Sequence, residues 1–95
     1  MLLANLLVSS SSMPKTHFFY IAECADGTLY CGYTNDLRKR EAAHNAGRGA
    51  KYTAGRSPVR IVYSEVFGSK GEALTREAEV KGFSREEKLG LVERG

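Results

Sequence analysis

Alternating hydrophobic and polar positions mark the first patterned part of the chain. Residues 17–24, HFFYIAEC, are aromatic and β-prone, and residues 25–27, ADG, form a turn signal. Residues 28–33 then predict the returning strand of a hairpin. Residues 59–67, VRIVYSEVF, alternate again and predict a third strand.

Helical spacing occupies the segments between and after these strands. Residues 35–46 predict a helix that ends at Gly47, and residues 48–58, RGAKYTAGRSP, predict a loop closed by proline. Capping-box patterns start two more helices, over about 69–81 and from 84 towards 92. The order β-β-α-β-α-α predicts an α+β domain, with a small, mainly antiparallel three-stranded sheet flanked by helices.

The turn at residues 25–27 decides which strand residues share a face. A two-residue turn would place Tyr20 and Tyr30 on opposite faces of the hairpin, because strand side chains alternate. A three-residue loop with Gly27 at positive φ would instead pair Tyr20 with Gly32 and put both tyrosines on one face. We expect the three-residue loop.

The chain is long enough for one compact domain but not for two, with 95 residues. Residues 1–15 begin with a short apolar run followed by serines, and we expect a disordered extension ahead of a domain at 16–95. A short helix packed on the domain is the alternative. The run lacks a basic lead and an A-x-A site, so we expect neither export nor a membrane span.

The two cysteines, Cys24 and Cys31, have neither a disulfide framework nor the spacing of a zinc site. They are typical of small buried side chains in a reducing compartment, which predicts a cytoplasmic protein.

Positive charge is concentrated in the middle of the chain. Residues 38–60 carry seven basic side chains and one acid, although the whole chain has a net charge of only +3. Such a patch is the footprint of a polyanion partner. A glycine-rich loop with interleaved Tyr52 and Thr53 favours nucleic acid over a merely solvated surface, since stacking and phosphate contacts suit such a loop. The candidate nucleic-acid contacts are Arg38, Lys39, Arg48, Lys51, Tyr52, Arg56 and Lys81.

One arginine of this patch lies beside the apolar stripe of its helix. On a helical projection Leu37 and His44 are about 20° apart, and Arg40 is about 60° to one side, whereas Arg38 and Lys39 point well away. A charge so close to a docking face needs an anionic partner to offset its desolvation. We therefore expect Arg40 to face a cleft that binds phosphate.

The order of short motifs along the chain resembles that of the GIY-YIG nuclease domain. The first motif, FFY at 18–20, keeps its tyrosine but has two phenylalanines in place of Gly and Ile. The second motif, YCG at 30–32, keeps its tyrosine and glycine, with cysteine in place of Ile. The family's arginine, ten residues beyond the second tyrosine, falls on Arg40. The family's glutamate, on a later helix, falls on Glu77 within residues 73–81.

The resemblance covers about 18–88 and looks closest to small, single-domain bacterial members related to the N-terminal nuclease domain of the bacterial excinuclease. It implies a metal-dependent DNA endonuclease acting in repair or recombination, with one Mg²⁺ or Mn²⁺ ion held by Glu77. Tyr20 would be the general base, and Tyr30 would position water or phosphate. Arg40 would clamp the scissile phosphate, while His44 would support the tyrosines or donate to phosphate.

Each of these residues also has a purely structural interpretation. Tyr20 and Tyr30 could be cross-strand aromatics, Glu77 could pair with Lys81, and His44 could be a satisfied helix-end histidine. The functional alternative is therefore a nucleic-acid-binding module that keeps the fold without turnover. The chain has no separate segment for recognising a DNA sequence. For the nuclease and for the binding module alike, the expected partner is therefore branched or flapped DNA, with a possible protein partner.

Overall fold

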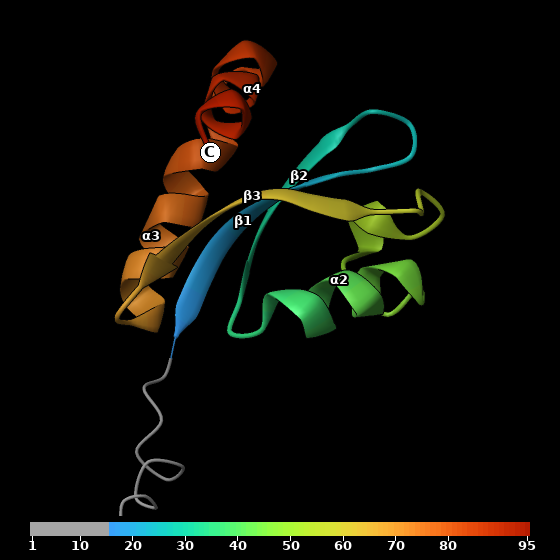
Figure 1. Ribbon diagram of the computed structural model, residues 1–95, viewed down its shortest axis with the longest axis horizontal. Coiled ribbons are helices and arrows are strands. Elements are labelled where there is room, and N and C mark those ends of the chain that lie inside the picture. The colour runs from blue at the N-terminus through green and yellow to red at the C-terminus, as the bar shows by residue number, and fades with distance from the viewer. Residues whose placement is uncertain (1–15) are drawn as a thin grey trace, which may run out of the picture.

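The computed structural model describes residues 16–95, so the extension expected at 1–15 lies outside the described residues. The elements follow the order β-β-α-β-α-α, and the strands form one antiparallel sheet in the order β2-β1-β3. The α+β prediction is confirmed (Figure 1). No helix of residues 16–95 is both long and apolar enough to cross a bilayer. The elements are β1 (His17–Glu23), β2 (Leu29–Thr34), α2 (Leu37–Asn45), β3 (Arg60–Phe67), α3 (Lys70–Lys81) and α4 (Arg85–Arg94).

The hairpin between β1 and β2 has the three-residue loop that we expected. The backbone N–H of Cys24 donates to the Thr28 carbonyl at 2.9 Å, and Gly27 has a φ of 85°. An L side chain rarely adopts this backbone conformation, so glycine suits the position. Tyr20 consequently pairs with Gly32, which places the two motif tyrosines on the same face.

The sheet separates two apolar clusters, one on each face. The Phe19 face is covered by α3 and α4, and the Tyr20 face by α2 (Figure 1). Cys31 belongs to the first cluster and Cys24 to the second, and both thiols are free, as expected. The buried members of the first cluster are Phe19, Ile21, Cys31, Val80 and Leu91. Those of the second are Tyr20, Ala22, Cys24 and Val59.

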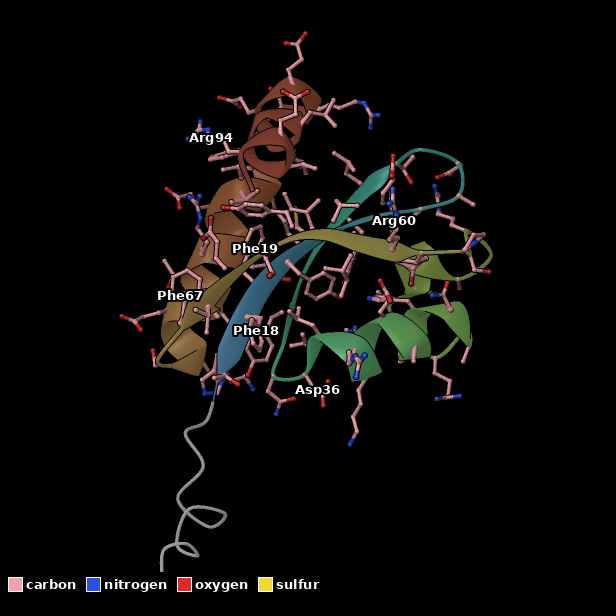
Figure 2. The ribbon with its side chains drawn as sticks, viewed as in Figure 1. Phe18, Phe19, Asp36, Arg60, Phe67 and Arg94 are labelled. Carbon is pink, nitrogen blue, oxygen red and sulfur yellow. The ribbon has the colours of Figure 1, made fainter. Side chains whose placement is uncertain are left out.

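Side-chain caps set where the helices begin. Asp36 has extended backbone angles and accepts a hydrogen bond from the Lys39 N–H at 3.0 Å, so α2 starts at Leu37 rather than near Asn35 as expected (Figure 2 labels Asp36). Ser84 forms a complete capping box with Glu87. The N-terminus of α3 has only the half in which Ser69 accepts from the Glu72 N–H, so its predicted capping box is incomplete.

The predicted loop at 48–58 contains one turn of 3-10 helix, Lys51–Thr53. This turn carries a side chain into the interior, because Thr53 is buried against α2. The loop thereby becomes part of the wall around the aromatic face of the sheet.

Candidate active site

Two strands and one helix bring three aromatic side chains together on the α2 side of the sheet. The ring centroid of Tyr20 lies 6.3 Å from that of Tyr30 and 5.9 Å from that of His44. Tyr30 and His44 are 5.5 Å apart, with their rings nearly perpendicular. The pairing predicted from the hairpin register is therefore extended by a histidine from α2.

Two side chains of α2 hold this helix in position against β3. The Asn45 amide donates to the Val59 carbonyl at 2.9 Å and accepts from the Val59 N–H at 2.6 Å. The Glu41 carboxylate accepts from the Ile61 N–H at 2.8 Å. These bonds satisfy backbone groups at the start of β3, and they fix the depth at which the residues of α2 meet the tyrosines.

A chain of hydrogen bonds runs inward from the arginine of α2. The Arg40 Nε–H donates to the Tyr20 hydroxyl at 3.3 Å, and that hydroxyl lies 2.7 Å from His44 Nε2. His44 Nδ1 lies 2.7 Å from Thr53 Oγ1, which donates its own proton to the Ala50 carbonyl at 2.9 Å.

The positions of the protons in this chain follow from counting donors. The Thr53 hydroxyl donates its single proton to the Ala50 carbonyl, so Thr53 Oγ1 can only accept a hydrogen bond from His44. The Nδ1 atom therefore carries the proton of the neutral His44 ring. His44 Nε2 then has a free lone pair and accepts from the Tyr20 hydroxyl. The buried phenol of Tyr20 therefore directs its proton towards a neutral imidazole.

Burial controls the protonation of both partners. It raises the pKa of Tyr20 to about 12, an increase that hydrogen bonding to Arg40 reduces. Burial also lowers the pKa of His44, and the nearby Arg40 charge lowers it further. At neutral pH the pair therefore rests as a phenol and a neutral imidazole.

Two glycines make this close packing possible. A Cβ atom at Gly32 would lie 2.5 Å from the Tyr20 hydroxyl oxygen, and a Cβ at Gly49 would lie 2.2 Å from His44 Nδ1. Neither site has room for a larger side chain. The motif glycine of β2 is thus required by its tyrosine partner, and Gly49 has the same relation to the histidine.

Arg40 is the arginine that reaches the cluster, as the helical projection indicated. It is partly buried, and within residues 16–95 no carboxylate lies at ion-pair distance from it. Arg38 and Lys39 are exposed. A half-buried guanidinium whose acceptors are phenols retains donors for an anionic ligand.

Glu77 lies on α3, which covers the opposite face of the sheet from α2. Its charge contributes to the raised pKa of Tyr20, as the smallest of five causes. Its carboxylate is 3.5 Å from the Lys81 ammonium, so the structural pairing described from the sequence is present. Among residues 16–95 no three metal-ligating side chains gather. Glu77 offers a single hard oxygen donor group, which fits Mg²⁺ because Mg²⁺ commonly takes one or two carboxylates and keeps several waters.

The remaining basic candidates lie at the surface. Arg48, Lys51 and Lys81 are exposed. Tyr52 is also exposed, and it stacks on Tyr30 at 5.8 Å between centroids.

Arg56 is already engaged within the protein. It pairs with Asp26 at 2.8 Å, and its guanidinium covers the Tyr52 ring at 4.3 Å. It therefore positions the aromatic side chain instead of pointing freely at solvent.

Sequence reasoning missed three residues of the site: Gly49, Thr53 and Asn45. None belongs to a periodic pattern, and the glycine-rich loop by itself suggests only phosphate contacts. The local signals are too weak, because each of these residues acts on a partner in another segment: Gly49 and Thr53 on His44, and Asn45 on Val59.

Known proteins resemble this chain over most of its length. A family model described as the GIY-YIG catalytic domain matches residues 16–89. A UPF0213 protein of Staphylococcus saprophyticus is 54% identical over 79 residues, covering 83% of this chain and 96% of its own. A UPF0213 protein of Haloquadratum walsbyi is 52% identical over 83 residues, covering 87% and 93%.

Solved structures agree with the sequence comparisons. The solution NMR structure of a protein from E. faecalis matches with a TM-score of 0.58 and 40% identity, over 84% of this chain and 85% of that one. The NMR structure of a UPF0213 protein from Bacillus halodurans matches with a TM-score of 0.53 and 50% identity, over 82% and 83%. The motif order, the shared face of the two tyrosines and these matches together lead to one conclusion: the chain belongs to the GIY-YIG catalytic-domain family.

Proposed function

We propose that this protein is a metal-dependent endonuclease that hydrolyses phosphodiester bonds in branched or flapped DNA, in repair or recombination. The observation that carries the proposal is the chain from Arg40 through Tyr20 and His44 to Thr53. It joins a cation suited to phosphate with a proton path that ends on a neutral base. A general base and a phosphate clamp are the groups that hydrolysis of a phosphodiester requires.

Arg40 acts first in this scheme, as the clamp. It has no carboxylate partner among the described residues, so a phosphate oxygen is a stronger acceptor for its guanidinium than the phenol that it contacts at 3.3 Å. Its movement onto the scissile phosphate uncovers the Tyr20 hydroxyl, which is otherwise fully buried. Substrate binding and exposure of the base are thereby coupled.

Tyr20 and His44 then share the work of the general base. As water attacks phosphorus, one water proton moves to the Tyr20 oxygen while the phenolic proton moves to His44 Nε2. The new P–O bond forms as the bond to the leaving oxygen breaks, and that oxygen takes up a proton from solvent. The imidazolium later returns its proton to the Tyr20 oxygen, which releases one to solvent. Because the phenol passes its proton on, tyrosinate never has to form at a pKa of about 12.

Tyr30 and Glu77 complete the site. Tyr30 is partly exposed beside both rings and positions the attacking water or a phosphate oxygen. Glu77 would hold one Mg²⁺ or Mn²⁺ ion, which would supply Lewis-acid stabilisation of the charge on the phosphate. For this role Glu77 must release Lys81, which is then free to contact the nucleic-acid backbone.

The exposed basic residues supply affinity rather than chemistry. Phosphate contacts from such side chains are independent of sequence, which fits a domain that selects DNA by structure. A protein partner could direct the domain to its substrate, and the free, buried cysteines fit a reducing cytoplasm. These contacts are Arg38, Lys39, Arg48, Lys51, Tyr52 and Lys81, with Arg56 holding Tyr52 in place.

A second candidate function is nucleic-acid binding without turnover. It is favoured by the complete burial of Tyr20 and by the ion pair between Glu77 and Lys81. A cleavage assay on labelled branched DNA with Mg²⁺ or Mn²⁺, with a chelator as the blank, separates the two functions. We expect metal-dependent cleavage by the wild type. In Glu77→Ala the cleavage rate should fall roughly a hundred-fold or more, because the ion's Lewis-acid contribution of several kcal/mol is lost.

The matched control for this assay is Glu93→Gln, which removes an exposed carboxylate at the end of α4. It should cleave like the wild type. Binding of branched DNA without cleavage in any divalent metal would support the binding module instead.

A further inference from the structure

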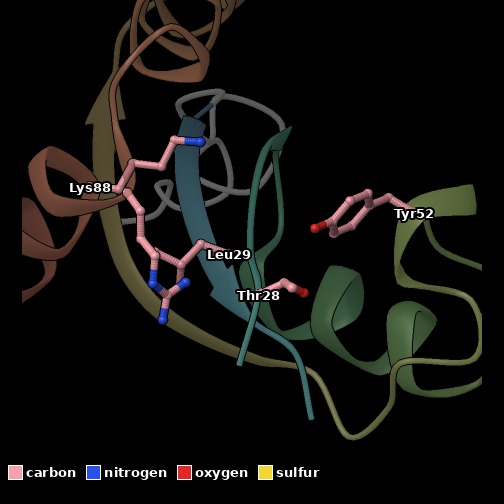
Figure 3. A pocket seen from close by; sticks show the side chains of 5 residues that line it. Thr28, Leu29, Tyr52 and Lys88 are labelled. Atoms are coloured by element: carbon pink, nitrogen blue, oxygen red, sulfur yellow. The ribbon is translucent and has the colours of Figure 1, made fainter. Parts of the chain in front are cut away.

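A small pocket lies beside β2, the outer strand of the sheet, and the proposed mechanism does not use its α4 residues. Its volume is about 190 Å³, below the roughly 300–1,000 Å³ of typical small-molecule sites, so it suits a small group. Figure 3 shows α4 on one side of the strand and the loop after α2 on the other. The pocket is lined by Thr28, Leu29, Tyr52, Arg85 and Lys88.

The two cations of this pocket, Arg85 and Lys88, have hydrogen-bond donors that no described side chain uses. One nitrogen of Arg85 donates to the Gly27 carbonyl at 3.0 Å, which holds the guanidinium in place and leaves its other donors open. Lys88 is half-buried, and it forms neither a hydrogen bond nor an ion pair with any side chain of residues 16–95. Its ammonium donors are therefore available to an anion in the pocket.

Neutral donors point into the same space. Figure 3 shows the Tyr52 hydroxyl directed towards β2. Cys24 and Thr28 form a hydrogen-bonded pair, so the next pair along the hairpin leaves the N–H of Leu29 facing away from β1. Because β2 has no neighbour on that side in the described sheet, this N–H lies at the open edge.

No carboxylate of the described residues lines the pocket. The nearby Asp26 is already used, because it accepts from Thr28 and pairs with Arg56. Several donors without a competing acceptor define a site for a small oxyanion, and a phosphate group has the matching charge and acceptor oxygens.

The position of the pocket connects it to the candidate active site. Tyr52 lines the pocket and also stacks on Tyr30, which is part of the catalytic cluster. Both Lys81 and Lys88 lower the pKa of the Cys31 thiol of β2, although burial raises it more. Their positive charges therefore lie on the α3 and α4 side of β2, on the opposite face of the sheet from the aromatic cluster.

We propose that this pocket binds a backbone phosphate of the nucleic-acid strand, a few nucleotides from the scissile phosphate at Arg40. The strand would cross the open edge of β2 from the aromatic cluster towards α4. This inference rests on the proposed function, and it adds Arg85 and Lys88 of α4 to the substrate contacts.

The test is DNA binding by the full-length Arg85→Ala/Lys88→Ala variant, measured by fluorescence anisotropy with chelator present so that cleavage does not interfere. For labelled branched and single-stranded DNA we expect about a ten-fold loss of affinity, and a slope of log Kd against log salt that is lower by about one unit. The control, Lys70→Ala/Arg94→Ala, removes two charges elsewhere and should change affinity less than about two-fold, since neither side chain lines the pocket. Melting curves should show that both variants are folded.

Equal losses in the two double variants would overturn the inference, since the effect would then be one of net charge alone. Inorganic phosphate is the second probe, followed by NMR shifts of the residues around the pocket. If phosphate binds there while the pocket variant binds DNA like the control, the pocket takes a free anion and the inference is wrong. Neither outcome depends on turnover. A wild type that binds DNA through this pocket but never cleaves it would refute only the proposed function.

Discussion

Replacement of Thr53 by valine removes both hydrogen bonds of the buried Thr53 hydroxyl, to His44 and to the Ala50 carbonyl, and almost no volume. Thr53 and His44 are each 1% exposed, so water cannot replace the lost hydroxyl. The Ala50 carbonyl keeps a partner, because it also accepts from the Thr53 backbone N–H at 3.0 Å. The change therefore leaves one buried group without a partner, the Nδ1–H of His44.

The cost follows from that single unsatisfied donor. A buried donor that loses its acceptor costs about 1–3 kcal/mol. In a domain of this size each 1 kcal/mol shifts Tm by roughly 4–8 °C. We expect Thr53→Val to lower the free energy of unfolding by about 2 kcal/mol and Tm by roughly 10 °C.

The same change should move the pH profile of cleavage in a defined direction. Protonated His44 needs acceptors for both of its N–H groups, and Thr53 supplies one of them. Without it the imidazolium is less stable, so the pKa of His44 falls further below its ordinary value. The acid limb of the kcat profile should therefore move to lower pH, while the plateau rate falls about ten-fold or more because the imidazolium also forms during the reaction.

Two variants separate this role from simple packing. Thr53→Ser keeps the hydroxyl and should restore most of the rate and the original pH profile. Thr75→Val makes the same exchange at an exposed position of α3, where the hydroxyl donates to the Gly71 carbonyl, and should have little effect. An unchanged profile in Thr53→Val, or a serine variant as impaired as the valine one, would refute the reasoning.

Three other variants test the assignments on α2. Arg40→Ala should abolish cleavage while leaving Tm and most DNA affinity intact, whereas Arg38→Ala should weaken binding only slightly; the reverse ranking would mean that the wrong arginine is assigned. The lowered pKa of His44 also predicts a pH dependence of stability. The neutral side chain contributes fully above its unfolded pKa of about 6.5, and the contribution is lost as pH falls through the lower folded-state pKa. Urea unfolding of the wild type should therefore lose more stability between about pH 7 and pH 5 than that of His44→Gln, and equal losses would count against a buried neutral imidazole.

Local chemistry was sufficient for much of the fold. The Ala25-Asp26-Gly27 loop determines the hairpin register, because Gly27 can adopt positive φ and each shift of one residue would move a tyrosine to the other face. The capping box at Ser84 and the helical position of Arg40 are equally local, since both depend on residues within one or two turns of each other. These features follow from spacing along the chain, and the structure confirms them.

The completed site depends on contacts that no spacing encodes. Asn45 and Glu41 hydrogen-bond α2 to the start of β3. The glycine-rich loop between them therefore folds back over the helix end, where Thr53 and Gly49 contact His44.

Lys88 likewise shares a pocket with Tyr52 only because α4 and this loop both border the same strand. Neither residue belongs to a periodic pattern in the sequence. Their shared role arises only when α4 and the loop after α2 pack at the same edge of β2. Residue order alone was therefore enough to predict the elements, the hairpin register and the arginine that reaches the tyrosines. The tautomer of His44 depends on Thr53, and the pocket that holds Lys88 depends on Tyr52, which in each case comes from a separate segment. Tertiary packing therefore decided both features.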